Sequence, residues 1–197
     1  MTAFIFILAA LGCCACFILA RYAPLRLSGA ALRRFRVCAL AVNAAALAAL
    51  WGNADSAALA ASRFFLLNML LFCAATDLRE LAVYDVHTYL LLLGGGVGAV
   101  FVFGAGFPVQ YLAFGVSCAV LRLASRRGAR FGAGDCRVIA AMALYFPLSR
   151  WMEVMLLSLF GAMLWGIAWV AVRRKTLRDE LPFMPFLLVG VLIENFL

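Results

Sequence analysis

Two short stretches of the chain, TDLRE at residues 76–80 and GAGDCR at residues 132–137, decide the fold. Each places an acidic residue, Asp77 or Asp135, at the edge of a long apolar segment. A charge at the boundary of a bilayer is costly, and ionisable residues kept there commonly serve a function. The two stretches therefore predict a membrane protein with a pair of functional carboxylates at the ends of its helices.

The composition is that of an integral membrane protein. Of the 197 residues, 68% are hydrophobic and 13% are charged, and the mean hydropathy is +1.06. Soluble domains are closer to half apolar and one quarter charged. We therefore expect an all-α, polytopic transmembrane helical bundle that forms a single integral-membrane domain over residues 1–197. The first apolar run lacks a preceding basic region and is followed by further apolar segments, so we interpret it as a retained helix.

The distribution of basic residues predicts how the chain crosses the membrane. With the N-terminus outside and every apolar segment crossing, 15 of the 17 basic residues lie on the cytoplasmic side, and only Arg63 and Arg150 lie outside. Basic residues favour cytoplasmic loops, so this asymmetry supports a topology of about eight transmembrane helices. Six crossings are the alternative, if residues 1–36 or the C-terminal segment lies in the membrane interface. Asp77 and Asp135 then share the cytoplasmic side. The apolar segments are 3–20, 37–51, 63–76, 86–103, 108–122, 136–148, 151–172 and 183–197.

Charge and cysteine content exclude other classes of partner and cofactor. The formal net charge is +8, but the basic residues lie between apolar segments, so we interpret them as topology signals and expect no nucleic-acid partner. The seven cysteines include one CxxC spacing, Cys13 with Cys16, but it lies inside an apolar segment and no second pair accompanies it, which argues against a zinc site or a disulfide framework. The sequence indicates neither a metal nor an organic cofactor.

Two carboxylates at one depth suit the hydrolysis of a peptide bond. One ionised carboxylate accepts a proton from a water molecule, while the other, protonated, polarises the scissile carbonyl group. Close like charges cannot both ionise cheaply, so one pKa rises and the two groups titrate as a coupled pair. The sequence alone does not assign these two roles between Asp77 and Asp135.

The chain resembles the type IV prepilin peptidases and their archaeal preflagellin relatives, which are membrane aspartyl proteases. Their first motif is an Asp that closes a helix, with Pro-Asp or Pro-Asn seven and eight positions later; here Asp77 is followed by Tyr84-Asp85. Their GxGDxK motif corresponds to GAGDCR at 132–137, and their PFxPF/Y element to LPFMPFL at 181–187, which contains Pro182 and Pro185. The resemblance covers residues 77–187.

The chain departs from the family pattern at two positions, and it lacks a segment of the larger members. Tyr84 stands where the family usually has Pro, so the turn after Asp77 is expected to differ. Arg137 replaces the usual Lys, and a planar guanidinium is not equivalent to a point charge. The connection at residues 21–36, which we interpret as an amphipathic interfacial helix, lacks the cysteine-rich insert of the larger bacterial members. The resemblance therefore implies peptidase activity without N-methyltransferase activity.

The resemblance implies a pilin-like, pseudopilin or archaellin-like precursor as substrate, cleaved between its basic leader and its hydrophobic helix. The site would face the cytoplasm from the inner (plasma) membrane. Asp77 and Asp135 would be the catalytic pair, and Gly132 and Gly134 would shape the approach of the substrate. Asp85 is the best candidate to meet the basic leader, and Arg137, Pro182 and Pro185 would complete the site. The oligomeric state stays open.

Other interpretations fit part of the pattern. Presenilin-like and signal-peptide-peptidase-like enzymes pair a YD motif with a later GxGD motif, which would make Asp85 and Asp135 the catalytic residues. A small transporter could use boundary acids to bind cations, and an assembly subunit could have lost catalysis. His87 is expected to be a packed or interfacial residue, and the glycines within 94–98 are expected to allow close helix packing.

Overall fold

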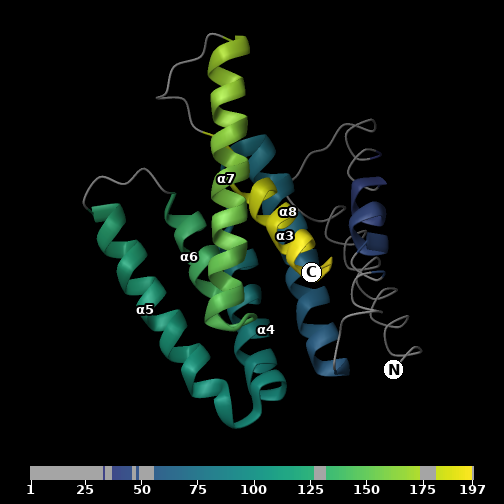
Figure 1. The fold of residues 1–197 in the computed structure, drawn as a ribbon, viewed down its shortest axis with the longest axis vertical. Coiled ribbons are helices and arrows are strands. Elements are labelled where there is room, and N and C mark those ends of the chain that lie inside the picture. Colours follow the sequence, from purple (N-terminus) through teal and green to yellow (C-terminus); the bar gives the residue numbers. More distant parts are fainter. Residues whose placement is uncertain are drawn as a thin grey trace.

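The computed structural model describes residues 33, 37–45, 48, 56–126, 132–173 and 181–196, and these are helical apart from short connections. The described part contains no strand, so the predicted all-α class is confirmed. The predicted segment 3–20 and the predicted interfacial helix at 21–36 lie almost wholly outside the described residues. The helices, shown in Figure 1, are α3 (Ala57–Glu80), α4 (Asp85–Phe103), η1 (Gly104–Gly106), α5 (Phe107–Arg126), α6 (Ala133–Met142), α7 (Leu148–Arg173) and α8 (Met184–Phe196).

Three described stretches are long and apolar enough to cross a membrane: 57–80, 85–124 and 148–171. The second comprises α4 and α5, between which the chain reverses at η1, where Gly104 adopts a positive φ of 51° (Figure 1). These lengths identify a multi-pass membrane protein. The total number of crossings and the side of the N-terminus stay predictions.

The segment expected at 136–148 differs from a full crossing. Helix α6 has 10 residues, or about 15 Å at 1.5 Å per residue, half of the roughly 30 Å apolar thickness of a bilayer. After Met142 the chain turns, and α7 already begins at Leu148. The turn was hidden in the sequence because its residues, including Tyr145 and Phe146, are as apolar and as buried as the helix before them.

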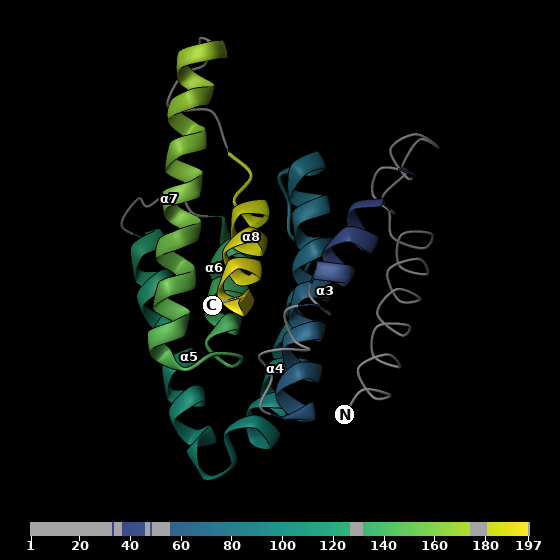
Figure 2. The same ribbon diagram turned by 45° about the vertical axis from the view of Figure 1, so that its right-hand side comes forward.

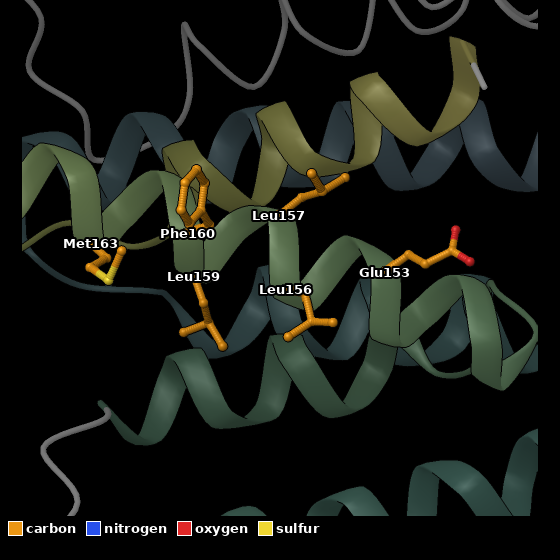
Figure 3. Close-up of a pocket in the computed structure, with 6 residues that line it drawn as sticks. All are labelled: Glu153, Leu156, Leu157, Leu159, Phe160 and Met163. Atoms are coloured by element: carbon orange, nitrogen blue, oxygen red, sulfur yellow. The ribbon is translucent and has the colours of Figure 1, made fainter.

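Helix α3 forms the centre of the bundle. It packs against α4 and α8, while α5 packs mainly on α6 and α7 mainly on α8 (Figures 1 and 2). By contrast, α4, α5 and α7 expose many apolar side chains, as lipid-facing helices do. Figure 3 shows an open apolar pocket on α7, with Glu153 at one end. Large side chains of the core include Leu66, Leu67, Leu70, Phe72, Val138, Ile139, Met142 and Leu187.

The glycines of α4 are packing features, as the sequence predicted. A Cβ atom on Gly94 would lie 2.3 Å from the Phe65 ring, and one on Gly95 would lie 2.6 Å from the Tyr145 ring. The Tyr145 hydroxyl donates a hydrogen bond of 2.8 Å to the carbonyl oxygen of Leu91. The two glycines therefore let α4 close on α3 and on the turn after α6.

A cluster of charged residues joins α3, α7 and α8 away from the aspartates. We call Arg63, Arg150, Glu194 and Asn195 the arginine cluster. Arg63 Nη1 lies 3.5 Å from one carboxylate oxygen of Glu194 and donates a 3.0 Å hydrogen bond to Asn195. Arg150 Nε lies 3.8 Å from the other oxygen, and the Glu194 side chain is only 3% exposed. The cluster fixes three helices to one another through a single buried carboxylate.

Candidate active site

Four helix ends meet at one end of the bundle, which we call the aspartate end. There α3 ends and α4, α6 and α8 begin (Figure 1). Helix α3 stops because Leu81 adopts the left-handed conformation (φ 51°, ψ 36°), and its N–H donates to the carbonyl oxygen of Asp77. A non-glycine residue in this conformation costs roughly 1–2 kcal/mol. The left-handed conformation of Leu81 therefore ends α3 just after Asp77, in its last turn, and directs the chain toward α4.

Asp77 is buried, with an exposed fraction of 4%, and is held by the start of α8. Its Oδ2 atom accepts a 2.8 Å hydrogen bond from the main-chain N–H of Met184, the first residue of α8. The main chain of Phe183 also hydrogen-bonds to this carboxylate. These two amides lie between Pro182 and Pro185, which have no N–H to offer. Sequence reasoning missed this contact, although two amides flanked by prolines were its signal.

Asp135 lies in the first turn of α6 and is half-buried. Burial and the negative charge of Asp77 raise the pKa of Asp135 to about 6, and a hydrogen bond to the backbone of Gly132 acts against this rise. The structure thus brings the two aspartates within electrostatic reach. Cys73, which is fully buried one turn before Asp77, interacts electrostatically with both carboxyl groups.

Both glycines before Asp135 lie where a side chain would intrude. A Cβ atom on Gly132 would lie 3.2 Å from Oδ2 of Asp135. One on Gly134 would lie 2.9 Å from Cβ and 3.4 Å from the carbonyl oxygen of Val83, in the loop that follows α3. Gly134 therefore lets α6 approach this loop, and Gly132 leaves space beside the carboxylate.

Asp85 and Arg137 form an ion pair at the exposed surface of the aspartate end. Their side chains, from the starts of α4 and α6, are 65% and 50% exposed. The two residues are 52 positions apart, and no local pattern in the sequence indicates that they pair. Asp85 therefore has a cationic partner within the chain itself.

Tyr84 takes a backbone conformation that proline could also take. Its φ of −73° and ψ of 140° fall in the polyproline region, close to the φ of −65° at which proline is fixed. The turn therefore keeps the geometry that the family's usual Pro would impose, although we expected it to differ. The Tyr84 hydroxyl donates to the Glu80 carboxylate.

His87 is packed, as expected. Its ring stacks on Phe72 with centroids 6.0 Å apart and meets the edge of the Tyr84 ring at 6.0 Å. Within the described part of the chain, no three His, Cys, Asp or Glu side chains lie together as a metal-binding group would require.

Comparison with known proteins agrees with these observations. The sequence model of the type IV leader peptidase family matches residues 64–171, which include Asp77, Asp85 and Asp135. No curated protein and no solved structure matches the chain. The matched range covers more than half of the 197 residues and contains both aspartates of the site. The chain therefore belongs to the type IV leader peptidase family and is a protease of that family.

Proposed function

We propose that this protein is an aspartyl endopeptidase that removes the short basic leader of type IV pilin-like or archaellin-like precursors at the cytoplasmic face of the inner membrane. The observation that carries the proposal is the meeting of two aspartates from separate helices, α3 and α6, at one end of a membrane bundle. Among the described residues, neither carboxylate is paired with a cation. Unpaired, interacting acids at a membrane boundary are costly and are typical of catalytic sites.

The reaction follows from the coupled pair. A water molecule between the carboxyl groups loses a proton to the ionised aspartate and attacks the carbonyl carbon, while the protonated aspartate gives its proton to the carbonyl oxygen. The resulting tetrahedral diol then collapses. The first aspartate passes its proton to the leaving nitrogen, the second recovers a proton from the diol, and the C–N bond breaks. The pair returns to its starting protonation state.

The position of the site suits a precursor with a basic leader and an apolar helix. The aspartates lie where helices of the bundle end, so the substrate helix can stay in lipid while its leader stays in water. Asp85 would exchange Arg137 for a basic residue of the leader. The same pairing and the 65% exposure of Asp85 disfavour a presenilin-like site built on Asp85 and Asp135, since the buried acid that interacts with Asp135 is Asp77.

The test is leader removal by the detergent-purified protein acting on a pilin-like precursor, followed by mass spectrometry of the products. Asp77→Asn and Asp135→Asn should each abolish cleavage. Glu153→Gln is the matched control, because it makes the same change at an exposed carboxylate of α7. Asp85→Ala should still cleave, more slowly because the leader loses an acidic partner, whereas Asp77→Ala should not cleave. Undiminished cleavage by either asparagine variant would refute the proposal.

A further inference from the structure

We infer that Asp77 is the ionised member of the pair and Asp135 the member that carries the proton, because main-chain amides at the start of α8 hold Asp77. This assignment rests on the proposed peptidase function and deepens it. It also gives the element at 181–187 a physical role. Met184 and Phe183 act as positioning residues through their backbones, and Pro182 and Pro185 set which amides are presented.

The start of α8 offers its free amides to Asp77. The first N–H groups of a helix have no partner within that helix. In α8 the N–H groups of Phe186 and Leu187 already donate to the carbonyl oxygen of Phe183, at 3.1 and 3.2 Å. Pro185 has no N–H, which leaves Met184 to donate to Asp77. Asp77 thus caps α8 from another helix, as an N-cap side chain would do from within.

This contact favours the charged form of Asp77. An ionised carboxylate is purely an acceptor, so every N–H that it faces forms a bond. Charge-assisted hydrogen bonds of this kind are stronger than neutral ones, and the positive end of the helix dipole acts in the same direction. The described residues place no cation on Asp77, so the start of α8 is what balances its charge.

The ionised form of Asp135 is stabilised by fewer neighbouring groups than the ionised form of Asp77. Its amide partner among the described residues is Gly132, at the start of its own helix, whereas Asp77 has two amide partners, Phe183 and Met184, at the start of another helix. Among the described residues, Cys73 of α3 is a titratable group that interacts electrostatically with both carboxyl groups. Arg137, two residues after Asp135 on α6, pairs with Asp85 of α4. When the pair holds one proton, that proton therefore lies on Asp135, beside the space that Gly132 leaves open.

The assignment gives each aspartate one role at each step. Asp77 takes the proton of the attacking water, and Asp135 protonates the carbonyl oxygen of the scissile bond. At collapse, Asp77 gives its proton to the leaving nitrogen and Asp135 recovers one from the diol. The amides of Phe183 and Met184 then hold Asp77 in its ionised form for the next turnover.

The assignment can be tested without a substrate. An apolar carbodiimide reacts with protonated carboxyl groups, and peptide mass mapping identifies the modified residue. At about pH 5 the wild-type protein should be labelled mainly on Asp135, and this labelling should be lost as the pH rises past about 6. Preferential labelling of Asp77 in the wild type would overturn the inference.

A pair of variants separates protonation from accessibility. Met184→Pro removes the donating N–H at the first position of a helix, where proline is well tolerated, and Met184→Leu keeps the N–H and the side-chain volume. Loss of one hydrogen bond to a charged group should raise labelling of Asp77 about tenfold in Met184→Pro relative to Met184→Leu. Equal labelling of Asp77 in the two variants would contradict the assignment. Because labelling needs no precursor, failure of the wild type to cleave would refute the proposed function separately.

Discussion

Two buried carboxylates on the same helix pair, α3 with α8, have opposite surroundings. Glu194 lies among Arg63, Arg150 and Asn195, with both of its oxygens near a guanidinium. Asp77 lies fourteen residues along α3 from Arg63, about 21 Å at 1.5 Å per residue, and faces backbone amides and a second acid instead. A buried carboxylate that lies between two guanidinium groups serves to join helices. A buried acid that is kept beside another acid is available for proton transfer.

The largest expected effect is that a substitution at Asp77 removes activity, whereas a substitution at Glu194 lowers stability. Asp77→Asn should lower processing at least about 10³-fold because it removes an acid–base partner. Glu194→Gln should leave processing largely intact and lower the free energy of unfolding by about 2 kcal/mol. The cost should fall short of the roughly 3–5 kcal/mol for a fully buried pair, because Arg150 is 44% exposed. Leader cleavage measures the effect on activity, and thermal unfolding in detergent measures the effect on stability. If Glu194→Gln were as inactive as Asp77→Asn, the two carboxylates would not have the different roles inferred here.

Gly134→Ala should have the next largest effect. The added Cβ would meet Val83 at 2.9 Å, which would displace the start of α6 and with it Asp135. A displacement of about 1 Å in a catalytic group can cost about 10²-fold in rate. Gly115→Ala in α5 is the matched control, because an added Cβ there has no neighbour within 4 Å. Kinetics of precursor cleavage should show a loss of about 10- to 100-fold in Gly134→Ala only. Equal rates in both variants would argue against close packing at Gly134.

The rate of processing should fall as the pH rises above about 6. The pKa of Asp135 is raised to about 6 by burial and by the charge of Asp77. The form that holds a proton therefore exists below that value and is lost above it, and catalysis needs this proton. The dependence of kcat/KM on pH measures the effect, with Glu153→Gln as a control that should share the wild-type profile. A rate that still climbs between pH 7 and 8 would contradict this assignment of the proton.

The smallest effect is expected at Tyr84. Tyr84→Pro removes a hydrogen bond to Glu80 but suits the backbone angles already present. Proline at a compatible position is neutral or stabilising by up to about 1 kcal/mol. Cleavage should therefore stay within about threefold of wild type. A loss as large as that of Gly134→Ala would show that this turn depends on the tyrosine side chain.

The sequence could predict features that depend on neighbours along the chain. It placed Asp77 and Asp135 at helix ends, and it identified the glycines of α4 as packing positions. It could not show that Arg63 and Arg150, the two basic residues left outside by the predicted topology, share the buried Glu194. That contact joins residues 63, 150 and 194, which local patterns do not relate.

Two further features are not carried by polar or charged side chains, and the sequence analysis missed both. The half-length of α6 was hidden because its terminal turn is as apolar as the helix. The role of the element at 181–187 was hidden because main-chain N–H groups carry it. Backbone donors are present at almost every residue, so only the folded geometry shows which of them face Asp77.

The proposed peptidase activity depends on Asp77 and Asp135 acting as one catalytic unit. The most direct test compares kcat/KM for leader removal in Asp77→Asn, Asp135→Asn and the double variant. Residues that act as a unit are strongly non-additive, so the double variant should be no slower than either single variant. Losses that multiply in the double variant, or a single variant that cleaves at the wild-type rate, would contradict the account.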